Sequence, residues 1–274
     1  MSSKLPPLIT PPLLRYLRQH PQLPKNTWYL IAAVTLTILN RPDEIPTVYR
    51  HALEHVTSSN VPGSESQSSS AYDVHAGDFT NSVGKAKLNE ELRILRRTRE
   101  ALLKTSAVAG APKVINACVA LKEATPQHLS DVDKFSVTGR SDDISGLSLS
   151  LVLRRGQQFF DKIYGKISGR VTRMMKDSGT EDLDQIALLL YGFILSNTTL
   201  LDQAETSYVL IAALIPQDLN PQLKGHLKGA LNGGASIDEV RAVREVVIRI
   251  CESAGMKKLD GMVGFGWQGD IADL

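Results

Sequence analysis

The residue types that carry redox and metal chemistry are few in this chain and lie far apart. Its two cysteines are Cys118 and Cys251. They provide neither the disulfide framework of a small secreted domain nor a Cys-rich zinc site, and they suit a reducing compartment. The sequence contains no GxGxxG run, no P-loop and no His/Cys ligand cluster. We therefore expect no metal and no nucleotide or flavin cofactor.

The overall charge does not favour a polyanionic partner. Lysine and arginine total 31 against 29 aspartates and glutamates, which leaves a formal charge of +2. The arginines between residues 93 and 99 alternate with glutamates, as on a solvated helix face, so we expect no nucleic-acid binding. The longest apolar runs, 28–39 and 186–195, are shorter than the roughly 20 residues that a membrane span needs.

Residues 1–23 form a basic N-terminal arm, and the first acidic residue of the chain is Asp43. An acid-poor basic start is one mark of organelle targeting, and the alternative is a solvated arm that packs on the domain. Arg15-Tyr16 and Gln22-Leu23, five residues apart, resemble a degenerate N-terminal peroxisomal signal, although Tyr16 replaces the preferred aliphatic residue. The last three residues do not resemble a peroxisomal tripeptide. We expect an intracellular protein, with mitochondrion, peroxisome and cytoplasm left open.

Apolar periodicity and stop signals predict an all-α fold. Helices are expected at 27–39, 43–56, 87–110, 111–123, 151–164, 166–177, 181–195, 203–215, 219–231 and 237–254. Half of the residues in 57–70 are serine, which predicts a loop over 57–86. Residues 125–150 are expected to be irregular. Ser236 and Glu239 have the spacing of a capping box at the start of the last helix.

The chain contains an internal repeat. Residues 99–113 align with 244–258, and upstream segments at 29–33 and 48–53 align with 208–213 and 226–231. We therefore expect two related helical units, each with its apolar face buried against the other. The expected organisation is the basic arm 1–23, a diverged first unit 24–123, a connecting part 124–200 with extra helices, and a second unit with a tail, 201–274.

Residues 205–258 resemble the carboxymuconolactone decarboxylase and alkylhydroperoxidase D superfamily. The resemblance rests on the apolar run 208–213, the stretch from His226 to Ser236 (HLKGALNGGAS), and the following helix to Gly255. It implies two alkylhydroperoxidase D-like units in an all-α fold. It also implies a homo-oligomer, for which we favour a trimer over a dimer.

The resemblance also specifies what is missing. Peroxidase members use a Cys-x-x-Cys pair, and the corresponding stretch here, 216–221, reads PQDLNP without a thiol. Cys118 and Cys251 fall on other helices, so neither is expected to be needed for activity. Thiol-based peroxide reduction is therefore not expected, because it needs an attacking thiolate and a resolving thiol.

What remains is acid–base chemistry. The resemblance gives Glu205 and His226 as the catalytic pair, since an imidazole oriented by a carboxylate can protonate an enolate-like carbon after loss of CO₂. Two structural alternatives stay open: Glu205 forms a capping box with Asp202, and His226 is a buried, hydrogen-bonded helix residue. Further polar candidates, each also explained as a structural hydrogen bond, are Tyr191, Ser196, Asn197 and Asn220.

Two functions follow from these residues. The first is a carboxymuconolactone decarboxylase-like protein that acts on an unknown small molecule by decarboxylase- or isomerase-type acid–base chemistry without redox thiols. The alternative is a non-catalytic oligomeric or interaction protein that retains the fold. Whether the chain is an enzyme is thus left open by the sequence.

Overall fold

Two helices that are apolar on every side lie at the centre of the molecule. The computed structural model describes residues 6–58, 76–130 and 137–274. Within them, α2 (Trp28–Ile38) is buried along its whole length, and α9 (Gln203–Leu214) is buried from Ala204 onward except at Glu205. The two helices pack against each other. A helix without a polar face must be covered on all sides, and the rest of the bundle provides that cover.

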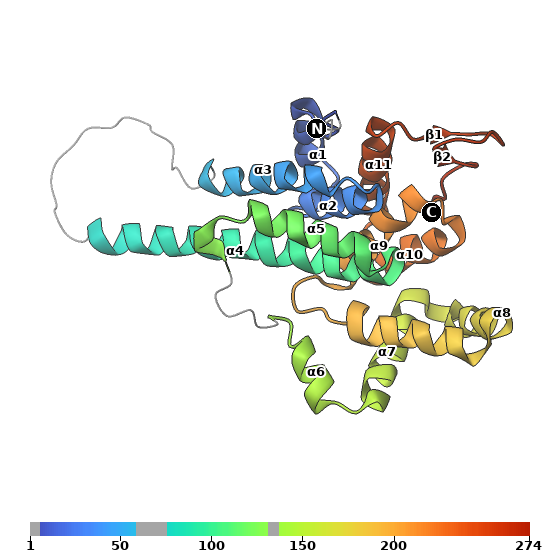
Figure 1. The fold of residues 1–274 in the computed structure, drawn as a ribbon. Coiled ribbons are helices and arrows are strands. Elements are labelled where there is room, and N and C mark those ends of the chain that lie inside the picture. Colours follow the sequence, from blue (N-terminus) through green and yellow to red (C-terminus); the bar gives the residue numbers. More distant parts are fainter. Residues whose placement is uncertain (1–5, 59–75, 131–136) are drawn as a thin grey trace.

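Four helices surround this central pair (Figure 1). They are α3 (Ile45–Ser58), α4 (Ala76–Ala109), α10 (Asn220–Asn232) and α11 (Ile237–Ser253). Helices α3 and α4 pack on α2, while α10 and α11 pack on α9; α4 also contacts α9, and α11 also contacts α2. Helix α5 (Ala111–Ala124) covers α3 and α4. The all-α prediction is confirmed.

A second layer lies beside this bundle (Figure 1). It consists of α6 (Arg140–Gly146), α7 (Leu149–Tyr164), the short helix η3 (Gly165–Ile167), α8 (Ser168–Leu189) and η4 (Leu190–Leu195), which is a π-helix. Helix α7 joins the layer to the bundle by packing on α10. Helix α8 is interrupted at Gly179 and Thr180, in agreement with the predicted break between 177 and 181.

The N-terminal segment is part of the fold. Helix α1 (Pro11–Gln19) buries three leucines, and the chain before it is held by Glu44, which lies in the short helix η1 (Pro42–Glu44). The backbone N–H groups of Leu8 and Ile9 donate to the Glu44 carboxylate, at 2.6 and 3.3 Å. Arg41 donates to the same carboxylate and to the carbonyl of Pro6. Of the two interpretations of this arm, packing on the domain therefore describes residues 8–19.

Three details differ from the sequence-based elements. Helix α4 begins at Ala76 and not at 87, so the predicted loop 57–86 is too long; most of its Ser-rich part lies outside the described residues. Residues 125–150, expected to be irregular, contain η2 (Gln127–Leu129) and α6. A short parallel pair, β1 (Lys257–Lys258) and β2 (Gly266–Trp267), follows α11. It is fixed by Trp267, whose indole N–H donates to the carbonyl of Ile215, in η5 (Ile215–Gln217).

No helix in the part of the chain that the structure describes is both long enough and apolar enough to cross a membrane.

Candidate functional site

His226 lies on α10, on the side that faces α7, and only 4% of its surface is exposed. Two glycines on the same helix let α7 approach closely. A Cβ at Gly225 would lie 2.6 Å from Cε1 of Tyr164, and one at Gly229 would lie 2.8 Å from a methyl group of Ile163. Because both positions lack a side chain, the Tyr164 ring can lie edge-on to the imidazole, with ring centroids 6.0 Å apart.

Tyr191 completes the surroundings of His226 from the π-helix η4. Its hydroxyl lies 3.5 Å from Nε2 of His226 and 3.3 Å from the hydroxyl of Tyr164. The position of η4 depends on a very close crossing with α7: a Cβ on Gly192 of η4 would lie 2.2 Å from the carbonyl oxygen of Val152 on α7, and a Cβ on Gly156 of α7 would lie 2.2 Å from that of Leu188, in the last turn of α8. Single π-helical turns occur often at functional sites, because they redirect side chains from an otherwise regular helix.

All three polar groups of this cluster are uncharged near neutral pH. Burial lowers the pKa of His226 to about 4, and no nearby charge contributes to that shift. Burial also raises the pKa of Tyr164, and raises that of Tyr191 well above its ordinary value. A buried neutral imidazole keeps one N–H donor and one lone pair, so it can give and accept a hydrogen bond.

Only one of the two ring nitrogens of His226 has a hydrogen-bond partner among the described residues. Nε2 of His226 faces Tyr191, whereas Nδ1 is buried and has no hydrogen-bond partner among the described residues. If Tyr191 donates to Nε2, then Nδ1 carries the proton; if Nε2 donates to Tyr191, then Nδ1 presents a lone pair. In either tautomer an unsatisfied polar atom remains inside the protein, which is costly and uncommon.

Glu205 does not reach this cluster. It is the third residue of α9, where its backbone N–H and carboxylate form the predicted capping box with Asp202, at 2.8 and 3.1 Å. Its carboxylate also pairs with the guanidinium of Arg97 on α4. The capping-box interpretation of Glu205 is therefore confirmed, and the structure does not bring the two predicted site residues, Glu205 and His226, together.

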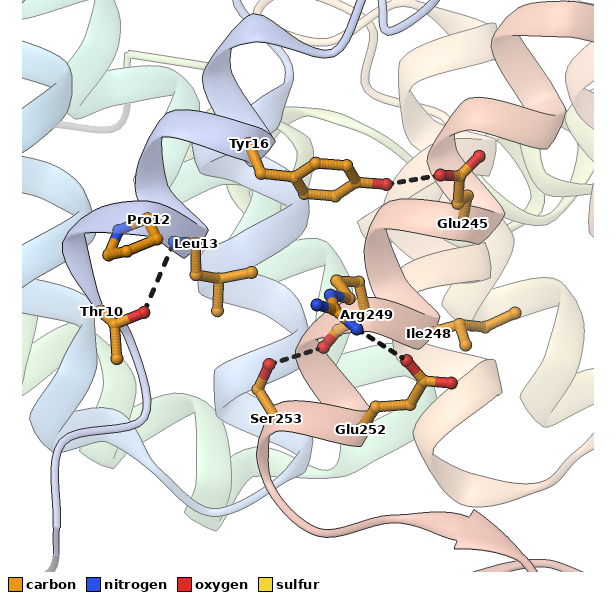
Figure 2. A pocket seen from close by; sticks show the side chains of 9 residues that line it. All are labelled: Thr10, Pro12, Leu13, Tyr16, Glu245, Ile248, Arg249, Glu252 and Ser253. Carbon is orange, nitrogen blue, oxygen red and sulfur yellow. Dashed lines mark hydrogen bonds and ion pairs between the residues drawn. The ribbon is translucent and has the colours of Figure 1, made fainter.

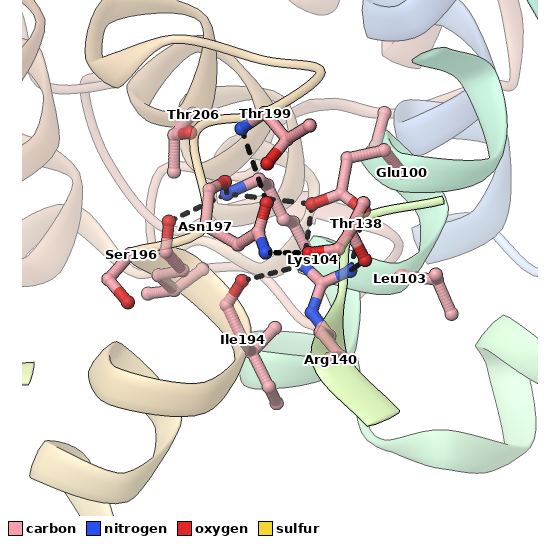
Figure 3. Close-up of polar contacts among 12 residues, drawn as sticks. Glu100, Leu103, Lys104, Thr138, Arg140, Ile194, Ser196, Asn197, Thr199 and Thr206 are labelled. Carbon is pink, nitrogen blue, oxygen red and sulfur yellow. Dashed lines mark hydrogen bonds and ion pairs between the residues drawn. The ribbon is translucent and has the colours of Figure 1, made fainter. Parts of the chain in front are cut away.

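Of the other polar candidates, one lies at the His226 site and three form structural hydrogen bonds. Tyr191 joins His226, but Ser196 and Asn197 help to fix the end of η4. There, Lys104 of α4 is fully buried and donates to the carbonyls of Leu195 and Asn197, at 2.6 and 2.8 Å (Figure 3). Burial lowers the pKa of Lys104 to about 8. Asn220 accepts from the N–H of Ala272, which fixes the C-terminal segment.

The ammonium group of Lys104 belongs to a buried ionic network. It lies 3.7 Å from Glu100, whose carboxylate receives two hydrogen bonds from Arg140, at 2.5 and 2.7 Å (Figure 3). Arg140 also donates to the carbonyls of Phe193 and Ile194 in η4. The network thus ties the second layer to the bundle. It also fixes the part of η4 that follows Tyr191.

The described residues offer little to a metal ion or to thiol chemistry. They contain no group of three or more His, Cys, Asp or Glu side chains that could hold a metal. Cys118 on α5 and Cys251 on α11 are both free, and burial raises the pKa of each thiol, which disfavours the reactive thiolate.

Fold and cluster together define an all-α protein with a buried histidine–tyrosine centre and no paired thiols. The chain is 32% identical to Peroxisomal protein 2 of Saccharomyces cerevisiae, with 92% of this chain and 96% of the relative covered. It is 34% identical to Peroxisomal protein 2 of Schizosaccharomyces pombe, over 90% and 91% of the two chains. The chain belongs to the Peroxisomal protein 2 family. No protein-family model matches it, and no solved structure matches it.

The lowered pKa of His226 makes stability depend on pH. In the unfolded chain an imidazole titrates near 6.5, and in the folded protein His226 titrates near 4. Between these values the unfolded state binds more protons, so the free energy of unfolding should fall as the pH drops from 6.5 to 4, by about 3 kcal/mol from this group. Urea unfolding of the wild type and of His226→Gln, which cannot titrate, isolates this contribution as a difference in slope. An imidazole NMR titration with a midpoint near 6.5 would contradict it.

Proposed function

We propose that the protein is a carboxymuconolactone decarboxylase-like protein that performs acid–base chemistry at His226 without redox thiols. The observation that carries the proposal is the buried, uncharged imidazole whose Nδ1 is unsatisfied while its Nε2 faces a tyrosine hydroxyl. In this proposal, Nδ1 is the atom that would contact an oxygen or carbon of the substrate, because it lies between two packed helices and has no other partner among the described residues.

The packing of the helices supports the two-unit organisation that the resemblance implies. Helices α2, α3 and α4 have counterparts in α9, α10 and α11, in the same order along the chain. The contacts are reciprocal as well, because α4 of the first unit packs on α9 and α11 of the second unit packs on α2. We propose that these units are related by an approximate twofold axis between α2 and α9.

The chemistry we propose differs from the sequence-based scheme in the partner of the histidine. A neutral imidazole with a low pKa is a weak base, but it is well suited to hydrogen-bond an oxyanion such as the enolate left when CO₂ departs. The Tyr191 and Tyr164 hydroxyls, which lie 3.3 Å apart, would supply the second donor and a path for the proton. Glu205 would act on stability alone, through α9 and Arg97.

A panel of carboxylated lactones and β-keto acids, assayed for CO₂ release, tests this assignment. His226→Gln should lower turnover by about 100-fold or more, the usual effect of removing an acid–base group, and Tyr191→Phe should lower it less. Glu205→Gln is the matched control: it should keep turnover but lower stability by about 1–2 kcal/mol, because the cap and the ion pair are weakened. Full turnover in His226→Gln would contradict the proposal.

The second function, a non-catalytic oligomeric protein, is favoured by exposed apolar side chains on the second layer. Ile144, Leu149 and Ile186 are each more than half exposed, and Leu147 and Leu183 lie in the same layer. Aliphatic side chains exposed to this extent are found at contact surfaces. We propose that copies of the chain associate through this layer, as a trimer in preference to a dimer; both functions allow it.

Sedimentation equilibrium at micromolar concentration measures this association. We expect a species at a multiple of the 29.9 kDa chain mass, and a lower mass for the double variant Ile144→Asp, Leu149→Asp. Lys166→Ala, elsewhere on the same layer, serves as a control that should not change the mass. A monomer across the whole dilution range would contradict self-association.

We also propose a peroxisomal location, on the names of the two relatives and on the signal-like residues of the arm. Arg15 and Gln22 are exposed, whereas Tyr16 is engaged with Glu245. Fluorescent fusions at either terminus should coincide with a peroxisomal marker, and Arg15→Ala with Gln22→Ala should disperse the fusion tagged at the C-terminus. The exposed substitution Lys25→Ala is the control. Diffuse fluorescence of both wild-type fusions would contradict the location.

A further inference from the structure

A groove separates α1 from α11, and its lining does not include His226 (Figure 2). Its volume of about 580 Å³ lies within the range of small-molecule sites. The lining combines apolar side chains with polar and charged ones, a combination that suits an amphipathic ligand. The lining residues that matter here are Pro12, Leu13, Tyr16, Glu245, Ile248, Arg249 and Glu252.

The Glu245 carboxylate is held in place from the opposite helix. The Tyr16 hydroxyl donates to its Oε1 at 2.5 Å, and Nε2 of His20 lies 3.6 Å from its Oε2. The Tyr16 and His20 rings meet edge to face, with centroids 5.7 Å apart. Burial and the contact with Glu245 raise the pKa of Tyr16 to about 12, so the phenol stays neutral. Glu245 is therefore oriented, yet 62% of its side chain remains exposed.

The one arginine that lines the groove in the described part of the chain, Arg249, pairs with Glu252 and not with Glu245. Arg249 lies 3.6 Å from Glu252, and these two largely exposed groups balance each other. The partners that reach Glu245 from the opposite side of the groove are the phenol of Tyr16 and the imidazole of His20. Among the described residues that line the groove, Glu245 and Glu252 face a single arginine, Arg249, so one negative charge remains; the apolar side chains of Leu13 and Ile248 line the same groove (Figure 2).

We propose that this groove binds a small amphipathic cation, with its ammonium group on Glu245 and its apolar chain along Leu13 and Ile248. A carboxylate has four lone-pair positions, so it can accept from a ligand ammonium in addition to Tyr16. An anionic ligand would face Glu245 and would have to displace Glu252 from Arg249. The site is separate from His226 and does not depend on the function proposed there.

Three probes with the same eight-carbon chain test the charge preference: octylammonium, octanoate and octanol. Calorimetry on the full chain at pH 8 should give an affinity for octylammonium at least about tenfold above that for the other two, as expected for a charge-assisted contact. Backbone NMR shifts at Leu13 and Ile248 locate the binding. Glu245→Gln should reduce the octylammonium affinity to that of octanol, and its amide oxygen can still accept from Tyr16, so α1 stays docked.

Glu252→Gln is the matched control, because it removes an equal charge from the same helix and should change the octylammonium affinity by less than about threefold. Circular dichroism and thermal unfolding verify that both variants fold. The proposal is overturned if octanoate binds as tightly as octylammonium, if octylammonium does not shift the groove residues, or if Glu245→Gln binds it like the wild type.

Discussion

Burial of two helices that have no polar face is the constraint from which the rest of this fold follows. Helices α2 and α9 would expose apolar surface to water, at a cost in free energy, unless other helices covered every side. Helices α3, α4, α10 and α11 provide that cover in pairs. Because α10 is in turn covered by α7, a residue between them is removed from solvent on both sides. The unusual state of His226 thus originates in the way α9 is enclosed.

The same enclosure explains why charged side chains inside the bundle are tightly partnered. Glu100 and Lys104 are almost wholly buried, and each is satisfied by Arg140 or by backbone carbonyls of the second layer. Isolated buried charges would be very costly, whereas a fully bonded network costs little and fixes the relative position of its elements. Glu44 has the same function for the N-terminal segment. Nδ1 of His226 is among the buried side-chain atoms of the described residues whose hydrogen bond is left unmade.

The helices could be predicted because their signals are local. The capping pairs Asp202–Glu205 and Ser236–Glu239 both form as their spacing indicates. The composition of the site could not be derived in the same way. Tyr164 is 62 positions from His226, and it comes close only because Gly225 lacks a side chain where α7 crosses. Nothing in the spacing of Glu205 and His226 reveals that Arg97, on a distant helix, takes the carboxylate. Pairings of this kind depend on tertiary packing, which periodicity does not encode.

The π-helix that carries Tyr191 has a consequence for how this chain can vary in length. In η4 a backbone N–H reaches five residues back, as Ser196 does to the carbonyl of Tyr191. Loss of one residue there would restore α-helical bonding and turn the preceding side chains by about 100° relative to those that follow. The Tyr191 hydroxyl would then leave the imidazole, although no residue of the cluster had been replaced. Within this segment, insertions and deletions would therefore alter the cluster more than most substitutions.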